Sequence, residues 1–335
     1  MKVAIVYSTP DPGESDVINV FGLQTKERYD PKMVALVASA LEQGGHEVRA
    51  IRGNMSIIDE LRAFMPRVAR GEGQGMVFNM AYGVQGRSRY THVPALLEML
   101  GLPYVGSGPC AHAVALNKVL SKVVLLHHNL PTPEFWVVVD PGQPLDGIRY
   151  PAIAKPEMEA ASFGVQLVED EAELRQAVAA ITREYEQAVL VEEFIPGREF
   201  AVSLLGNGPT LDTLPIVEID LGGDPSAYQS YQLKMVVHPR KLCPAEVAPE
   251  TEAELKRLSR CTFNALGISD FARVDFRMDP AGKLHVLELN SMASLNLTGS
   301  FVKSAEVAGL DFAALVNRML DVAVARYPAS AFPRS

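Results

Sequence analysis

Four polar side chains interrupt the most strand-like segment of the chain, residues 273–296. Residues 279–282, Asp-Pro-Ala-Gly, have the preferences of a type I turn, so we expect a hairpin in which Asp279 faces Gly282. In this register Asp275 faces Val286, and Arg273 faces Glu288. Because side chains alternate along a strand, one side of the hairpin would carry Arg273, Asp275, Glu288 and Asn290, and the core side would carry Val274, Phe276, Leu287 and Leu289.

The shared side of this hairpin has two interpretations. It could be the solvated outer face of an antiparallel pair, and a register shift of one residue would separate the two acids. However, Asp and Asn are poor strand formers. Oxygen donors that converge on one patch are what a hard cation such as Mg2+ needs, so the hairpin indicates a candidate Mg2+ site.

Two lysines and three glutamates elsewhere could act on the same ligand. Lys155 ends the apolar strand "YPAIAK", where a charge needs a reason, whereas Lys118 lies early in a helix and could be a simple exposed residue. Glu192 and Glu193 follow "AVLV", and Glu199 follows "IPGR". These acids could hydrogen-bond an adenine amino group and a ribose, or they could be a charged strand end and turn.

Composition narrows the class of protein. The chain has 335 residues, 48% hydrophobic, with a net charge of -9. The acidic balance, without a Lys/Arg-rich run, argues against a nucleic-acid partner. The N-terminal apolar run is too short for a secretory signal, and no segment has the apolar length of a membrane span. Cys110, Cys243 and Cys261 lack metal-type spacing and are expected as reduced thiols in a cytoplasmic protein.

Strands and helices alternate in the first hundred residues. Strands are expected at 2–7, 46–51, 75–80 and 103–106, and helices at 30–45 and 94–101. Asp30 is the expected N-cap of the first helix, with Pro31 at its first position. This alternation predicts a parallel, Rossmann-like sheet with helices on its faces. The chain lacks a GxGxxG after the first strand, which disfavours a dinucleotide-binding dehydrogenase.

The organisation changes after about residue 107. We expect a helix at 113–129, strands at 132–139, 150–156 and 163–168, a helix after the acids 169–171, and two strands around an Ile-Pro-Gly turn within 188–206. The polar segment 220–244 resembles a functional lid. A helix at 250–266 precedes the hairpin, and Asp311 caps a closing helix. The expected domains are 1–106, 107–192 and 193–325, followed by a loosely ordered tail, 326–335.

The order of these elements resembles the ATP-grasp superfamily. The resemblance rests on Lys118, Lys155-Pro156, Glu192-Glu193-Phe194, Arg198-Glu199-Phe200, Arg273-Val274-Asp275 and Glu288-Leu289-Asn290. Within that superfamily, "GLPYVGSGPCAHAVALNKVLSK" at 101–122 is similar to the D-alanine–D-alanine ligase family, whose members carry G-[LI]-P-Y-[TV]-G-S before a helix with a nucleotide-contacting lysine. The resemblance covers about residues 1–325. It implies an α/β ATP-grasp fold with three domains, α+β in its nucleotide-binding part, and a homodimer formed through the N-terminal region.

The resemblance also implies an activity and a set of site residues. The activity is ATP-dependent ligation of a carboxylate to an amine through an acylphosphate, with amino acids or other small molecules as substrates. Lys118 and Lys155 would contact ATP phosphates, Glu192, Glu193, Phe194, Ile195 and Leu287 would surround adenine, and Glu199 would bind the ribose. Asp275, Glu288 and Asn290 would hold two Mg2+ ions, or Mn2+ in their place. Arg273, Ser162 and the loop residue Lys234 would be catalytic, and Asp16, Arg87, Ser300 and Phe301 would lie near the substrates.

Departures from the family pattern cluster around the amino-acid pockets. Ala160 and Ala161 stand where a glycine and a serine are usual, and Met235 stands where a lid tyrosine is usual. The early glutamate of the family has a counterpart in Asp16 or Glu14. The segment "NSMASLNLTGS" replaces N-T-S-P-G and is one residue longer. We therefore expect substrates other than, or in addition to, two D-alanines. Strict D-alanine ligation and an ATP-binding module without ligase activity are the alternatives.

Overall fold

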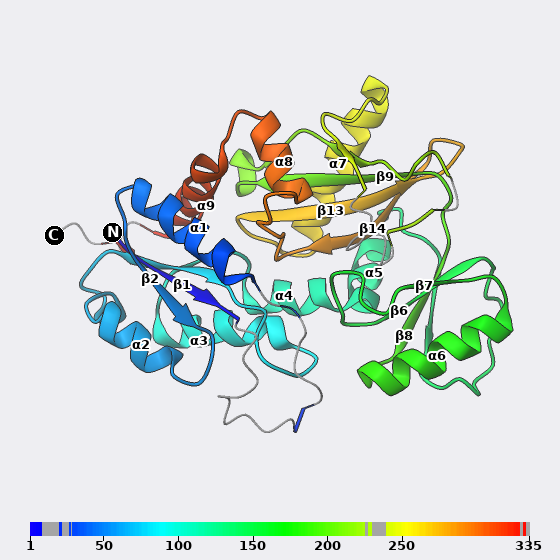
Figure 1. The fold of residues 1–335 in the computed structure, drawn as a ribbon, viewed down its shortest axis with the longest axis horizontal. Coiled ribbons are helices and arrows are strands. Elements are labelled where there is room, and N and C mark those ends of the chain that lie inside the picture. The colour runs from blue at the N-terminus through cyan, green and yellow to red at the C-terminus, as the bar shows by residue number, and fades with distance from the viewer. Residues whose placement is uncertain are drawn as a thin grey trace.

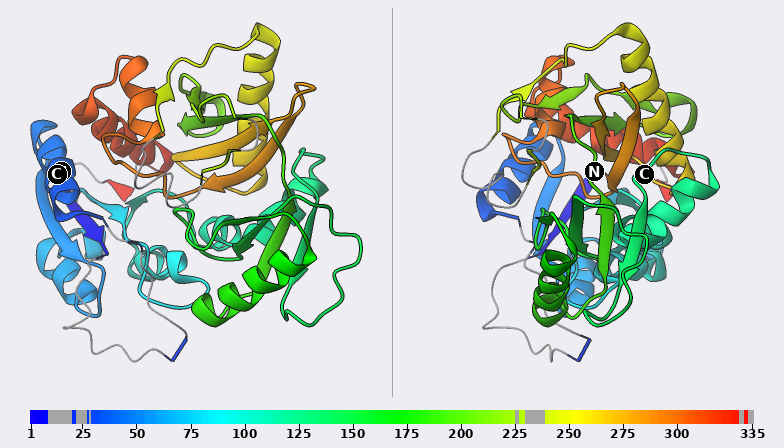
Figure 2. Two further views of the ribbon diagram at one scale, coloured as in Figure 1. Left: turned by 45° about the vertical axis from the view of Figure 1, so that its right-hand side comes forward. Right: turned by 90° about the vertical axis from the view of Figure 1, so that its right-hand side faces the viewer.

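Three β-sheets with flanking helices make up the computed structural model, which describes residues 1–8, 20–21, 27, 29–224, 227–229, 239–328 and 331–332. Figure 1 shows an N-terminal sheet at the left, a C-terminal sheet at the upper right and a smaller central sheet at the lower right. The two other views keep the three sheets apart (Figure 2). The expected α/β class is confirmed, with one parallel and two antiparallel sheets.

The N-terminal sheet is parallel, as predicted, in the order β2-β1-β3-β4. Its strands are β1 (Lys2–Tyr7), β2 (Glu47–Arg52), β3 (Gly75–Met80) and β4 (Tyr104–Val105), and its helices are α1 (Pro31–Gln43), α2 (Ile57–Phe64) and α3 (His92–Leu100). The Asp30 side chain caps α1 by accepting a hydrogen bond from the Lys32 backbone N–H, and Pro31 opens the helix. The predicted N-terminal elements therefore form with small changes in their ends.

The last helix of the chain packs against this first sheet. α9 (Phe312–Arg326) begins after the predicted cap Asp311, whose side chain accepts from the Ala314 N–H. Its buried residues share one hydrophobic cluster with residues of β1, β3 and α1, and Figure 1 shows α9 beside α1. The proposed boundary at residue 106 therefore separates sheets but does not separate cores.

The central sheet is antiparallel, in the order β5-β8-β6-β7. Its elements are β5 (Phe135–Val138), β6 (Ala152–Pro156), β7 (Gln166–Val168), β8 (Val189–Glu193) and the covering helix α6 (Glu171–Tyr185). Asp170 caps α6 by accepting from the Glu173 N–H. The sheet and α6 enclose a separate small core.

The C-terminal sheet is also antiparallel, in the order β12-β11-β9-β13-β14, with β10 paired to β9. Its strands are β9 (Arg198–Leu205), β10 (Asp212–Thr213), β11 (Val217–Ile219), β12 (Lys241–Leu242), β13 (Phe271–Met278) and β14 (Leu284–Asn290), and the helix α7 (Pro249–Ala265) covers one face. The two strands predicted around the Ile-Pro-Gly turn are β8 and β9, and they belong to different sheets.

The predicted hairpin forms, but its predicted register is wrong. Asp279 pairs with Lys283 across the turn, instead of facing Gly282. A β-bulge then shifts the register again, so that Phe276 faces Val286 whereas Asp275 faces Glu288. The extra residue is Leu287, which lines a cavity rather than joining the core face to which the regular alternation assigned it. The bulge restores Asp275, Glu288 and Asn290 to one side.

The single helix predicted for 113–129 is wrong. The chain forms α4 (Pro109–Leu116) and α5 (Lys118–His127), bent by 100° with respect to each other. Asn117 has an extended backbone, and its side chain caps α5 by accepting from the Leu120 N–H. Asn is a good N-cap, so it ends one helix and starts another although the apolar pattern runs through it.

Two further features went beyond the expected elements. The helix α8 (Ser300–Val307) begins at the last residue of the segment that departs from the family pattern. Tyr327, in the tail expected to be loose, donates its hydroxyl to the Tyr104 carbonyl and accepts from the Tyr104 N–H.

Among the described residues, no single helix has the length and apolar composition of a membrane span, and α4 with α5 meets those criteria only as a bent pair.

Candidate active site

One cavity of about 1300 Å3 is lined by strands of the central and C-terminal sheets and by Glu27, Tyr82 and Tyr90, which lie outside the strands of the N-terminal sheet. Most of the residues predicted for the site line it: Lys118, Lys155, Ser162, Glu192, Glu193, Phe194, Ile195, Glu199, Arg273, Asp275, Leu287, Glu288, Asn290 and Ser300. These residues come from segments as far apart in the chain as α5 and α8. The fold therefore brings together residues that the sequence places in separate motifs.

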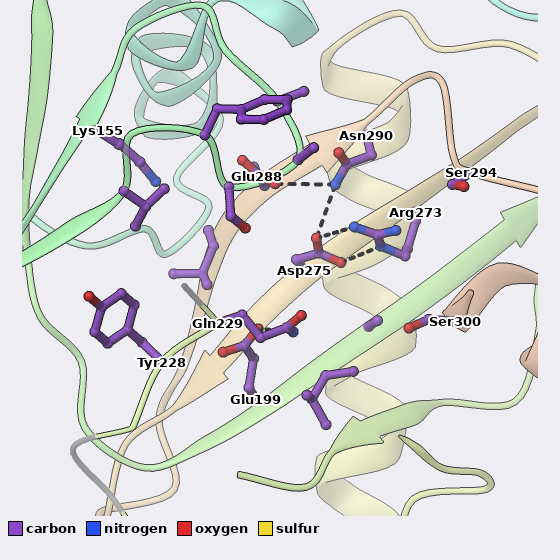
Figure 3. A pocket seen from close by; sticks show the side chains of 18 of the residues that line it. Lys155, Glu199, Tyr228, Gln229, Arg273, Asp275, Glu288, Asn290, Ser294 and Ser300 are labelled. Carbon is purple, nitrogen blue, oxygen red and sulfur yellow. Dashed lines mark hydrogen bonds and ion pairs between the residues drawn. The ribbon is translucent and has the colours of Figure 1, made fainter. Parts of the chain in front are cut away.

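Four side chains of the β13–β14 hairpin converge on one side of the cavity (Figure 3). Arg273 donates two hydrogen bonds to Asp275, each 2.7 Å long. The Asn290 amide donates to Asp275 at 3.0 Å and to Glu288 at 3.4 Å. Burial opposes the charge of Arg273, but the attraction of Asp275 outweighs it and raises the pKa of the guanidinium. The patch therefore combines a fixed positive charge with two carboxylates.

The donor set of this patch fits Mg2+. Asp275 and Glu288 supply carboxylate oxygens and Asn290 supplies an amide oxygen. In the part of the chain that the structure describes, no three His, Cys, Asp or Glu side chains are grouped so that they could hold a metal ion by themselves. Mg2+ is usually held by one or two carboxylates and completes its shell with water and substrate phosphate. Asp275, Glu288 and Asn290 would thus hold such an ion only together with a phosphorylated ligand.

A buried cationic cluster faces the cavity from the central sheet. Glu192 on β8 forms ion pairs with both Lys155 on β6 and Lys122 on α5. Burial alone would raise the pKa of Glu192, but the two ammonium groups hold it below its usual value. Burial lowers the pKa of Lys122 to about 8, against the opposing effect of Glu192. Lys122 was not among the predicted residues, although its position four residues after Lys118 was a usable signal.

Lys118 holds the loop that follows Lys155 through two hydrogen bonds. The Lys118 ammonium donates to the Glu159 carbonyl, and its backbone N–H donates to the Glu157 carbonyl at 3.1 Å. Ala161 and Ser162 both have left-handed backbones, with φ of 54° and 62°. Non-glycine residues adopt this conformation at a cost in conformational free energy. Residues strained in this way cluster at functional sites. Ser162 lies on the cavity wall, as expected.

Glu199 is held in place by two neighbours at the other end of the hairpin. Its carboxylate accepts from the Gln229 amide at 2.6 Å and from Arg277 at 3.4 Å, and Figure 3 shows Glu199 beside Gln229. The Arg277 guanidinium also lies over the Phe194 ring, 5.1 Å from its centroid. The oriented carboxylate and the nearby apolar wall of Phe194, Ile195 and Leu287 suit a ribose next to a base.

The residues predicted to lie near the substrates do not all reach the cavity. Ser300 lines the cavity, but Phe301 is fully buried in the core shared with α9, and Arg87 is exposed and outside the cavity lining. Asp16 and Lys234 lie outside the described residues, as does Met235. The structure therefore supports Ser300 as a cavity residue and does not bring Arg87 or Phe301 to it.

A buried network that sequence reasoning missed forms the N-terminal wall of the cavity. Arg89 is ion-paired with Glu27 at 2.7 Å and with Glu159 at 3.5 Å, and it donates to the Met158 carbonyl at 2.8 Å. The Tyr90 hydroxyl donates to Glu27 at 2.5 Å. Glu27, Glu159 and Tyr90 line the cavity. Arg87 was predicted to lie near the substrates, but the buried arginine of this segment is Arg89.

Comparisons with known proteins agree with this geometry. A model of the family described as "D-ala D-ala ligase C-terminus" matches residues 140–321. A D-alanine–D-alanine ligase from Moorella thermoacetica is 30% identical over 335 residues, covering 97% of this chain and 99% of that protein. The chain belongs to the D-alanine–D-alanine ligase family. An uncharacterized protein, y4sG, from Sinorhizobium fredii is 40% identical and covers 98% of each chain.

Solved structures extend the comparison to the fold. The D-alanine–D-alanine ligase from Bacillus anthracis, solved in complex with ATP, has a TM-score of 0.74 with 19% identity, and the match covers 97% of this chain and 98% of that one. The ligase from Coxiella burnetii has a TM-score of 0.70 with 20% identity. The ATP-grasp fold expected for this member of the D-alanine–D-alanine ligase family is confirmed.

Proposed function

We propose that the protein is an ATP-dependent carboxylate–amine ligase that forms a C–N bond through an acylphosphate and releases ADP and phosphate. The observation that carries this proposal is the cavity that the Asp275–Glu288–Asn290 patch and the cations Lys118 and Lys155 line together. Phosphoryl transfer depends mostly on positioning and charge neutralisation, and these two groups supply both. Bound Mg2+ would neutralise developing charge between the phosphates.

The chain's own residues account for the other requirements of this reaction. Lys118 and Lys155 would neutralise phosphate oxygens, and Glu199 would orient the ribose. Arg273, which Asp275 holds by two hydrogen bonds, would face the oxyanion that forms when an amine attacks the acyl group. Ser162 and the lid residue Lys234 would assist at the terminal phosphate. An enclosed cavity would also keep water from the acylphosphate.

The substrates that we propose are amino acids other than, or in addition to, two D-alanines. Ala161 removes a hydroxyl from the cavity wall, and the nearby acid Glu27 is engaged with Arg89 and Tyr90. Glu27, Tyr90 and Ala161 all line the cavity. Such a wall differs in charge and shape from one in which a glutamate, a serine and a tyrosine bond to one another.

The decisive experiment measures phosphate release with ATP, Mg2+ and pairs drawn from a panel of D- and L-amino acids. We expect release that depends on an amino acid other than D-alanine, with the ligated product identified by mass. Robust release with D-alanine alone would assign strict D-alanine ligation. Tight ATP binding without turnover on any panel member would assign a nucleotide-binding module instead.

We further propose that the protein acts as a homodimer in the cytoplasm. The family resemblance and the three free cysteines support this proposal. Light scattering coupled to size-exclusion chromatography would test it, and a monomer at micromolar concentration would contradict the dimer.

A further inference from the structure

We propose that Lys122 is a positioning residue that sets the affinity of this site for the nucleotide, by holding Glu192 and, through it, Lys155. The inference rests on the proposed use of ATP. Lys122 itself is 1% exposed and lies outside the cavity lining, whereas Glu192 and Lys155 are both on the cavity wall. Lys122 therefore acts on a ligand only through its neighbours.

The contacts of Lys122 join three parts of the structure around the site. Its ammonium on α5 pairs with one carboxylate oxygen of Glu192, and Lys155 pairs with the other. It also donates to the Thr132 hydroxyl at 2.6 Å, and that hydroxyl donates to the Val286 carbonyl on β14 at 2.8 Å. Val286 immediately precedes the bulged residue Leu287. Lys122 thus connects α5, the central sheet and the strand that carries Glu288.

The charge of this cluster points to an anionic ligand. Two ammonium groups share one carboxylate, and Glu192 is 2% exposed. One lysine would be enough to neutralise Glu192, and burying an additional charge is costly. The surplus positive charge lies where Lys155 reaches the cavity, so a phosphate bound there would balance it.

Loss of Lys122 would redistribute these interactions. Lys155 would become the sole cationic partner of Glu192 and would be drawn into a neutral pair. Its ammonium would then be less available to phosphate, and Glu192 would lose the contact that fixes its second oxygen. We therefore expect weaker nucleotide binding with little change in the handling of amino acids.

The test measures MgADP binding by calorimetry in the full-length protein, which requires no ligation. We expect Lys122→Met to weaken MgADP binding and raise the KM for ATP about tenfold, the order of one hydrogen bond to a charged group. The KM for the amino-acid substrates should change less than about threefold, because Lys122 lies away from their end. Lys256→Met is the matched control, since Lys256 pairs with Glu252 on an exposed helix face, and it should bind MgADP as the wild type does.

Two further variants separate positioning from a purely structural role. In a Glu192→Gln background, Lys122→Met should cause little additional loss of MgADP affinity, because the partner through which it acts has been altered. Thr132→Val keeps the Lys122 charge but removes an acceptor, and it should weaken MgADP binding about two- to fivefold. If Lys122→Met does not fold, the MgADP affinity of Thr132→Val tests the proposal in its place.

Three results would overturn the proposal. One is wild-type affinity for MgADP in folded Lys122→Met, and another is wild-type affinity in Thr132→Val when Lys122→Met does not fold. The third is a loss of MgADP affinity on Lys122→Met that is equally large in the wild-type and in the Glu192→Gln background. If the wild type binds neither MgADP nor ATP, the proposed function fails together with this inference, whereas wild-type binding with an unaffected variant removes only the inference.

Discussion

Arg273 and Asp275, two residues apart on β13, are joined side by side by two hydrogen bonds of 2.7 Å. The carboxylate that we propose as a metal ligand is thus also the group that orients the proposed oxyanion-binding guanidinium. A cation bound at Asp275 would share that carboxylate with Arg273 and with the Asn290 amide. Metal binding and the position of Arg273 would therefore be coupled.

The acids of the hairpin should be essential for turnover and dispensable for folding. Asp275→Asn and Glu288→Gln each remove a carboxylate charge while keeping the shape of the side chain. We expect turnover to fall on the order of 100-fold or more, because metal-assisted charge stabilisation is worth several kcal/mol. Phosphate-release rates and thermal unfolding would be measured together. Asp212→Asn, at an exposed pair with Arg260, is the control, and near-normal rates in both hairpin variants would refute the metal assignment.

The junction between β13, β4 and α9 should be a major source of stability. Asp270 is fully buried and accepts two hydrogen bonds from Arg326, both 2.9 Å, and one from the Gly106 N–H at 2.8 Å. Asp270→Asn would leave the Arg326 charge without its carboxylate, so we expect a loss of about 3 kcal/mol. Urea unfolding would measure it. The exposed pair Glu254–Arg257 supplies the control, in which Glu254→Gln should cost about 0.5 kcal/mol or less.

Stability in acid should depend on His112. Burial lowers the pKa of this imidazole to about 4, and its Nδ1 lies 2.8 Å from the Ser291 hydroxyl. The unfolded chain would bind a proton near pH 6.5 and the folded chain only near pH 4, so the free energy of unfolding should fall as pH decreases between these values. The contribution is on the order of 3 kcal/mol.

The measurement for His112 is urea unfolding at several pH values between 4 and 7. His112→Gln cannot titrate, so its unfolding free energy should vary less over this window than that of the wild type. Parallel pH profiles of the two proteins would show that His112 does not contribute.

The loop after Lys155 should tolerate a methyl group poorly at Gly164. Gly164 has a φ of +70°, and an added Cβ would lie 2.7 Å from Pro156 Cγ and 2.9 Å from Tyr185 Cε2. Gly147 is the matched control, because its φ is +81° but nothing lies within 4 Å of an added Cβ. Gly147→Ala should cost about 1 kcal/mol from the left-handed backbone alone, and Gly164→Ala should cost about 1–3 kcal/mol more from overpacking. Equal unfolding free energies for the two variants would show that the loop relaxes around the methyl group.

Much of the fold was predictable because it follows local rules. Asp30, Asp170 and Asp311 cap helices where the sequence has an aspartate just before apolar residues at helical spacing. The Asp-Pro-Ala-Gly turn forms, and the polar side chains of the hairpin share one side. Alternating strands and helices in the first hundred residues gave the parallel sheet.

Some of the missed features depend on contacts between distant segments, and others depend on a local bulge or cap that the apolar pattern hides. A β-bulge at Leu287 leaves no mark in the local pattern, and Asn117 breaks a helix only because its side chain finds the Leu120 N–H. Arg89 matters because Glu27 and Glu159 reach it from other segments, and Lys122 matters because Glu192 does. Spacing alone could not distinguish a buried partner from an exposed charge.

The bulge at Leu287 also limits how this strand can change. Deleting Leu287 would make the pairing regular and leave Glu288 opposite Asp275, whereas regular pairing at the present length would turn Glu288 and Asn290 toward the core. Substitutions that preserve length could still alter the residues between them. The bulge, and not the side chain at position 287, therefore decides on which side Glu288 and Asn290 lie, and a related sequence that lacks this one residue should pair regularly here with its acid still opposite the counterpart of Asp275.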